Sequence, residues 1–174
     1  MKKTIDAFDY AGHICKAMKK GILLTTQANG QVNTMTIGWG KIGIEWNTPV
    51  FIAYVRESRH THAMLEANGE FTVNIPVGEI DPEILRCCGT KSGRDTDKIK
   101  LLGLNPVPSE VISVPGIQEL PLTLECRVIY KQLQDVSAIP EKMIKRFYPE
   151  DSSGNQDIHV AYYGEIVNAY LYEA

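Results

Sequence analysis

The sequence lacks the features that would place it in a membrane, on a nucleic acid or outside the cell. Its 174 residues contain no run of the roughly 18 apolar residues that a membrane-spanning helix needs. The first ten, MKKTIDAFDY, turn polar and acidic at once and do not resemble a signal peptide. The formal net charge of −3 argues against sequence-independent binding to nucleic acid or to an anionic membrane. We therefore expect a cytoplasmic protein with neither kind of partner.

Metal-binding and disulfide patterns are also missing. The four cysteines, at positions 15, 87, 88 and 126, contain no C-x-x-C pair, and a bridge between two adjacent cysteines would strain disulfide geometry. We predict free, mostly buried thiols, although the sequence leaves the reactivity of Cys87 and Cys88 open. His60 and His62 lie on different faces of a helix, and no acidic cluster joins them, so no metal site is predicted.

What the chain does contain is a series of short apolar segments separated by Gly, Pro and Asn. With 44 % hydrophobic and 22 % charged residues, its length fits a single domain over residues 1–174. The predicted strands are Ile22–Thr26, Val32–Gly38, Val50–Arg56, Phe71–Pro76, Leu122–Leu133 and Val160–Tyr172. The predicted helices are inserted singly and begin near Ser58, Asp81, Asp95 or Thr96, and Pro140. This order predicts a mainly β fold, an antiparallel barrel with short helical insertions, and not a doubly wound sheet.

Two of these strands differ in their predicted burial. VFIAYVR, residues 50–56, is apolar on both faces and should be buried on both sides. LTLECRVIYKQL, residues 122–133, alternates between apolar and polar residues, which is typical of a half-solvated strand. The residues predicted to face inward are Leu122, Leu124, Cys126, Val128 and Tyr130, and those predicted to face solvent are Glu125, Arg127 and Lys131.

GWGKIG, residues 38–43, is a literal G-x-G-x-x-G, the pattern of the phosphate-binding turn in dinucleotide-binding domains. That turn must follow a strand and open a helix. Here the next residues, IEWNTPVFIAYV, predict a turn and another strand instead. We therefore interpret these glycines as part of a strand that bends or lets a ligand approach its backbone closely.

Two basic, hydroxyl-rich loops indicate an anionic ligand. In RESRHT, residues 56–61, a strand ends and a helix begins, so free backbone N–H groups make a phosphate cradle; an ordinary helix cap with a solvated arginine is the alternative. CCGTKSGRDTDK, residues 87–98, either holds another part of the anion or is a solvated connection. The anion-binding candidates in the two loops are Ser58, Arg59, Thr61, Lys91, Ser92 and Arg94.

Two further polar residues lie in or next to apolar strands. Asn74 interrupts FTVNIP, residues 71–76, and a buried amide needs partners, so it serves either a ligand or the fold itself. His159 opens the last strand after a polar loop, where it either donates to a substrate from the rim of a site or lies in solvent. No feature supports a catalytic thiol or serine, because Cys88 has no His nearby in sequence and G-x-S-x-G is absent.

Taken together, these segments resemble the flavin reductase-like family, the FMN-binding split barrels that include flavoredoxins. The resemblance covers about residues 14–172, and its strength lies in the order and spacing of several motifs. They are NTMTIGWG at 33–40, RESRHT at 56–61, GEFTVNIP at 69–76, CGTKSGRDTDK at 88–98, LECRV at 124–128 and DIHVAYYGEIV at 157–167.

The resemblance implies an antiparallel split β-barrel that works as a homodimer, with one FMN per subunit near the subunit interface. The residues carried over to the flavin and its ribityl chain are Asn33, Met35, Thr36, Ile37 and Trp39. Those carried over to the phosphate are Ser58, Arg59 and Thr61. Asn74 would lie beside the flavin, with Cys88, Lys91 and Ser92 closing the site. His159 would orient a nicotinamide, although the long run ahead of it, residues 136–156, departs from simpler members and leaves its role open.

The leading hypothesis is an NAD(P)H:flavin oxidoreductase. A nicotinamide, NADH or NADPH, would deliver hydride to N5 of FMN, and the electrons would pass to free flavin, a ferric complex or a partner protein. Because the cofactor carries the redox chemistry, the chain needs no acid–base pair of its own. The alternatives are a flavoredoxin-type electron carrier without a nicotinamide site and a non-enzymatic FMN-binding protein.

Overall fold

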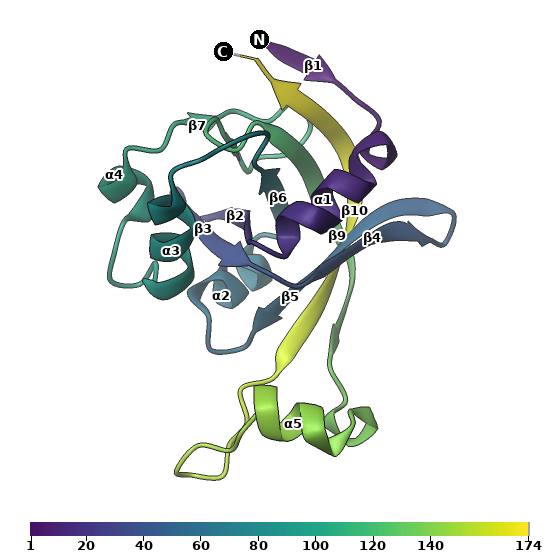
Figure 1. Cartoon of the computed structure of the whole chain (residues 1–174), viewed down its shortest axis with the longest axis vertical. Helices are drawn as coiled ribbons and strands as arrows, with labels where there is room; N and C mark the ends of the chain where they lie inside the picture. Colours follow the sequence, from purple (N-terminus) through teal and green to yellow (C-terminus); the bar gives the residue numbers. More distant parts are fainter. Residues whose placement is uncertain (174) are drawn as a thin grey trace.

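The computed structural model describes residues 1–173 and arranges them around one antiparallel sheet of eight strands (Figure 1). The strand order is β3-β2-β6-β9-β10-β5-β4, and β1 pairs with β10 beside this path. The strands of this sheet are β1 (Lys2–Thr4), β2 (Ile22–Ala28), β3 (Gln31–Ile37), β4 (Gly40–Glu45), β5 (Thr48–Arg56), β6 (Glu70–Ile75), β9 (Leu122–Leu133) and β10 (His159–Tyr172). A second, two-stranded sheet pairs β7 (Pro106–Val107) with β8 (Gly116–Ile117). The predicted mainly β, antiparallel fold with helical insertions is confirmed.

The helices are short and lie between strands, but the prediction that each is inserted singly was wrong for α3 and α4, which both lie between β6 and β7. They are the 3-10 turn η1 (Ala7–Tyr10), α1 (Ala11–Met18), α2 (His60–Ala67), α3 (Pro82–Thr90), α4 (Lys98–Leu102), the 3-10 turn η2 (Val136–Ala138) and α5 (Glu141–Phe147). Asp81 caps α3 by accepting a hydrogen bond from the backbone N–H of Glu83, which confirms that helix start. None of the helices within residues 1–173 has the length and apolar character needed to cross a membrane.

Two predicted helix starts were wrong by two residues or so. Helix α2 begins at His60 and not at Ser58, because the Ser58 hydroxyl donates to the carboxylate of Asp157 instead of capping the helix. Helix α4 begins at Lys98, because Asp97 is the residue whose carboxylate accepts from the first turn. Helix α1 and strand β4 were not predicted at all.

The glycine-rich segment 38–43 links β3 to β4 and continues into β4, so no helix follows it. The dinucleotide reading is therefore excluded by the structure. A Cβ atom on Gly40 would lie 2.8 Å from Phe51 Cζ and 3.0 Å from the carbonyl oxygen of Ile52. The group packed closely on Gly40 is the neighbouring strand β5. A ligand's close approach to this backbone stays a prediction.

Strand β5 is buried on both faces from Val50 to Ala53, as predicted, whereas β9 departs from its predicted alternation. Glu125, predicted to face solvent, is fully buried, and Tyr130, predicted to face inward, is 40 % exposed. The reason is that the first half of β9 is covered by the segment after β7, while its second half runs beyond the core together with β10 (Figure 1).

The insertion between β9 and β10 forms an arm, residues 134–158, that carries η2 and α5 and extends from the end of the two strands (Figure 1). Arg56, the last residue of β5, holds it by donating to the carbonyl oxygens of Asp157 and Phe147, at 2.5 and 2.8 Å. Asp157 in turn accepts hydrogen bonds from the backbone and side chain of Ser58. The arm is thus attached where β5 ends and α2 begins.

Candidate functional site

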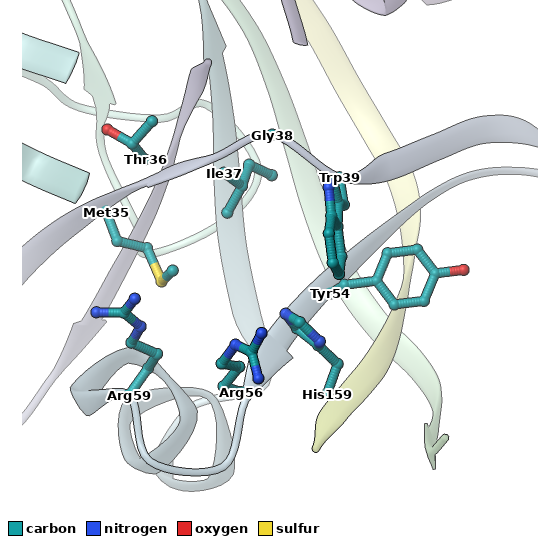
Figure 2. Close-up of a pocket in the computed structure, with 9 residues that line it drawn as sticks. All are labelled: Met35, Thr36, Ile37, Gly38, Trp39, Tyr54, Arg56, Arg59 and His159. Carbon is teal, nitrogen blue, oxygen red and sulfur yellow. The ribbon is translucent and has the colours of Figure 1, made fainter. Parts of the chain in front are cut away.

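A first cavity, of about 210 Å³, opens where the β3–β4 link passes the end of β5 and the start of β10 (Figure 2). Its lining residues are Met35, Thr36, Ile37, Gly38, Trp39, Tyr54, Arg56, Arg59 and His159. The wall is aromatic and apolar on the strand side, and two guanidinium groups lie on the opposite side (Figure 2). Such a cavity suits a flat ring system with a polar edge.

His159 is 7 % exposed and lies against the Trp39 indole, with ring centroids 5.0 Å apart. Its Nδ1 atom is 2.8 Å from the hydroxyl of Tyr148, which the arm supplies. Burial lowers the pKa of His159 to about 4, and the positive charge of Arg56 acts in the same direction. His159 is therefore a neutral imidazole near pH 7, able to form hydrogen bonds but not to supply a charge.

A second cavity, of about 160 Å³, lies between the start of α2 and the loop after α3. Its lining residues are Asn33, Met35, Ser58, Arg59, His60, Thr61, Cys88, Gly89, Lys91, Ser92, Gly93, Arg94 and Lys98. Met35 and Arg59 line both cavities, so the two adjoin; we call the pair the groove, with an aromatic wall in the first cavity and a cationic end in the second.

The cationic end of the groove has positive charge without a matching carboxylate. Arg59, Lys91, Arg94 and Lys98 form no ion pair within residues 1–173. Lys98 is only 4 % exposed, and its ammonium group donates to the carbonyl oxygen of Lys91 at 3.1 Å. Burial lowers the pKa of Lys98, and burial together with Arg94 and Lys98 lowers that of His60. An anion bound here would offset charges that the protein leaves uncompensated.

The loop that closes this end requires a glycine. A Cβ on Gly93 would lie 2.2 Å from Asn33 Oδ1 and 2.8 Å from His60 Cδ2, so the backbone packs directly on the cavity wall. Asn33 is held there because its amide donates to the Thr61 hydroxyl at 3.0 Å. The wall is therefore preformed before any ligand binds.

The structure brings most of the predicted site residues to this groove. Those at the first cavity are Met35, Thr36, Ile37, Trp39, Arg59 and His159, and those at the second are Asn33, Met35, Ser58, Arg59, Thr61, Cys88, Lys91 and Ser92. Two of the hydroxyls are already used within the protein: Thr36 donates to the carbonyl oxygen of Leu85, and Ser58 donates to Asp157. Cys88 has its pKa raised to about 11 by burial, so it is a protonated wall residue and not a nucleophile.

Asn74 is not brought to the groove. Its side chain is fully buried within the sheet, where the amide nitrogen donates to Thr25 and Thr72 and the amide oxygen accepts from the backbone N–H of Ile117 and the hydroxyl of Thr123. Asn74 thus lines neither of the two cavities, and its placement beside a flavin stays a prediction. The sequence left open whether Asn74 serves a ligand or the fold. Its contacts match a role in the fold, because its hydrogen-bonding groups already have partners in the protein.

Apart from glycines, four residues of the groove were not predicted as site residues: Tyr54, Arg56, His60 and Lys98. Tyr54 precedes Arg56 by two residues on β5, so strand periodicity places both on one face and could have identified them together. His60 lies inside the motif RESRHT, and its neighbours Arg59 and Thr61 were predicted site residues, so the motif could have identified it. Lys98 is the last residue of the basic segment 87–98, but only the folded chain shows that this lysine is buried.

Comparison with known proteins agrees with this architecture. The profile of the flavin reductase like domain matches residues 17–174. An uncharacterised protein of Archaeoglobus fulgidus is 33 % identical over 97 residues, a match that spans 56 % of this chain and only 54 % of that protein. Flavoredoxin from Methanosarcina acetivorans superposes with a TM-score of 0.64 at 27 % identity, over 88 % of this chain and 68 % of that one. An FMN-binding domain of a flavin reductase-like enzyme from Shewanella baltica has the same fold, with a TM-score of 0.63 at 15 % identity. The match covers 98 % of this chain and 77 % of that one.

Proposed function

Because this chain belongs to the flavin reductase-like family, we propose that it is an FMN-binding oxidoreductase. In this proposal a nicotinamide nucleotide, NADH or NADPH, reduces the flavin, and the electrons pass to free flavin, a ferric complex or a partner protein. When bound, FMN would supply the redox chemistry, hydride and electron transfer. The residues of the groove bind and orient it.

The observation that carries the proposal is that aromatic residues line one end of the groove and cationic residues line the other. FMN has a flat ring system at one end and a phosphate dianion at the other, which matches an aromatic wall that leads to unpaired cations. The buried ammonium of Lys98, whose partner is a single carbonyl oxygen, fits a phosphate ligand well. Arg59 reaches both cavities and would bind the phosphate from the side of the ring.

The remaining residues of the first cavity would shape the environment of the ring. The Trp39 indole packs edge-on against Phe147, with ring centroids 5.1 Å apart, so α5 supports the aromatic wall from outside the cavity. Arg56 and Arg59 would favour additional negative charge on a ring bound between them. His159 is neutral near pH 7, so it would form a hydrogen bond to the ligand without adding a further positive charge.

The second candidate is an electron carrier of the flavoredoxin type, which exchanges electrons with another protein and has no nicotinamide site. The 27 % identity to the Methanosarcina acetivorans flavoredoxin favours it. A non-enzymatic FMN-binding protein would share the groove but would be reduced by no physiological donor.

The first experiment is the visible absorption spectrum of the purified protein, with the chromophore released by heat and identified by mass. We expect a flavin spectrum and FMN. A colourless protein that also fails to take up added FMN would contradict the proposal and both of its alternatives.

Anaerobic mixing of the FMN-loaded protein with NADH or NADPH then separates the three functions. Rapid bleaching of the flavin absorbance by either nucleotide supports the enzyme. Bleaching only by a reduced protein donor supports the carrier, and a flavin that none of these donors reduces supports the binding protein.

A further inference from the structure

The arm contributes a hydrogen-bonded chain of three side chains that ends at the first cavity. The Tyr148 hydroxyl, at the end of α5, is 2.7 Å from Gln134 Oε1 and 2.8 Å from His159 Nδ1. Tyr148 is 4 % exposed, so water does not compete freely for these contacts.

The backbone around this chain is also fixed. The N–H of Gln134 donates to the carbonyl oxygen of His159 at 3.0 Å, and the Gln156 amide donates to the carbonyl oxygen of Tyr148 at 2.7 Å. The three side chains therefore belong to an ordered connection between the arm and the start of β10.

Counting protons along the chain assigns the tautomer of His159. The carbonyl oxygen of the Gln134 amide can only accept, so the single phenolic proton of Tyr148 points to it. The Tyr148 oxygen is then left to accept, and Nδ1 of His159 must be the donor. A neutral imidazole carries one N–H, so Nε2 has none.

We propose that Gln134 and Tyr148 are positioning residues that hold His159 as its Nδ1–H tautomer and so present Nε2 to the first cavity as a hydrogen-bond acceptor. Nε2 makes no hydrogen bond within residues 1–173, and His159 lines the cavity beneath Trp39, with one ring nitrogen directed toward its middle (Figure 2). The ligand group that this atom selects is an N–H or O–H donor, such as a carboxamide or a ring N–H. A ligand that offers only carbonyl oxygens at this point is disfavoured.

This inference gives the arm a role in the site, since two of the three residues belong to residues 134–158. It does not depend on which ligand fills the cavity, and it is tested on the protein without added flavin. Failure of FMN binding and failure of this inference are therefore separate results.

The test is long-range ¹H–¹⁵N correlation NMR of the four histidine side chains at pH 8, with the His159 signals assigned by their loss in His159→Gln. In the unsubstituted protein we expect Nδ1 in the range of a protonated nitrogen and Nε2 in the range of a bare one. An Nε2–H tautomer would overturn the proposal.

Three variants test the hydrogen-bonded chain from Gln134 through Tyr148 to His159. Gln134→Met removes the acceptor, which frees the phenolic proton to point at Nδ1, so the pattern should reverse to Nε2–H. Gln134→Glu keeps an acceptor and should retain the original tautomer. Tyr130→Phe, which removes an exposed hydroxyl outside the cavity, is the control and should leave the His159 tautomer unchanged.

If Gln134→Met gives a poorly dispersed amide spectrum, Tyr148→Phe replaces it, and loss of the Nδ1–H signal is then expected. Retention of the Nδ1–H tautomer in a folded Gln134→Met or Tyr148→Phe protein would show that neither side chain positions the imidazole.

Discussion

At the scale of single residues, the most informative feature is positive charge that the protein does not balance itself. Arg59 and Lys98 face the same cavity, and neither forms an ion pair within residues 1–173. The two residues differ in their effect on the stability of the folded protein. Arg59 is exposed, whereas Lys98 is buried, so only Lys98 destabilises the unliganded protein.

Replacing Arg59 with Ala should weaken FMN binding by about 1.5–3 kcal/mol, the range of a hydrogen bond to a charged group. The reason is that Arg59 would bind the phosphate where the two cavities meet. Fluorescence titration of the flavin-free protein with FMN measures the change. Arg127→Ala removes an exposed arginine outside the groove and should leave the affinity unchanged. An unaltered affinity in a folded Arg59→Ala protein would remove this side chain from the site.

Replacing Lys98 with Met should have opposite effects on stability and on binding. The free energy of unfolding of the flavin-free protein should rise by roughly 0.5–2 kcal/mol, as is common when a group kept for function is removed. FMN affinity should fall. Urea unfolding and flavin titration on the same preparation measure both quantities.

The pH dependence of this stabilisation follows from the lowered pKa of Lys98. Between that lowered pKa and the usual 10.5, the unfolded chain binds more protons than the folded one, so the folded protein gains stability as the pH rises. The advantage of Lys98→Met should therefore be fully present below the lowered pKa of Lys98 and shrink as the pH rises toward 10.5. A variant that is less stable than the unsubstituted protein at pH 7 would show that the charge of Lys98 is already compensated.

At the scale of elements, β9 shows how a buried acidic residue can organise a loop. The Glu125 carboxylate accepts hydrogen bonds from the backbone N–H groups of Glu110, Val111 and Ile112 and from the Asn168 amide. These donors take up the lone pairs of a carboxylate that water does not reach. The segment after β7 is therefore held on the sheet by one side chain.

Replacing Glu125 with Gln should destabilise the fold by about 1–3 kcal/mol, because the amide NH₂ group would face backbone N–H donors in a buried site. Thermal or urea unfolding measures the loss. The matched control is Glu141→Gln, which changes a highly exposed glutamate on α5 and should shift stability by less than about 0.5 kcal/mol. Equal effects of the two substitutions would contradict this account of the loop.

At the scale of the whole molecule, an aromatic patch made of Trp46, Tyr130 and Tyr163 lies on the strands that extend beyond the core. The ring centroids of Trp46 and Tyr130 are 5.8 Å apart, and those of Tyr130 and Tyr163 are 4.9 Å apart. Trp46 is 63 % exposed and has a φ of 49°, a left-handed conformation that is costly for a bulky side chain. We propose that a second copy of the chain covers this patch, which agrees with the homodimer that the family resemblance implies.

Light scattering coupled to gel filtration should then give twice the chain mass of 19.4 kDa. Trp46→Glu places a charge in the proposed interface and should shift the protein toward the single-chain mass. Met143→Glu, on the exposed side of α5, is the control and should leave the mass unchanged. A single-chain mass for the unsubstituted protein at micromolar concentration would rule out a stable dimer.

The sequence by itself determined six of the strands (β2, β3, β5, β6, β9 and β10), the antiparallel class and most of the groove, because those signals are local. Apolar periodicity, the Asp81-Pro82 helix start and the hydroxyl-rich basic loops act over a few residues, and their structure follows from neighbours in the chain. Only the tertiary structure decided the burial and the hydrogen-bond partners of Asn74, Glu125 and Lys98. A polar side chain in an apolar strand can face a ligand, solvent or a partner from a distant segment, and that choice depends on what packs over it. The same holds for the arm, whose contact between Tyr148 and His159 joins residues that the sequence could not pair.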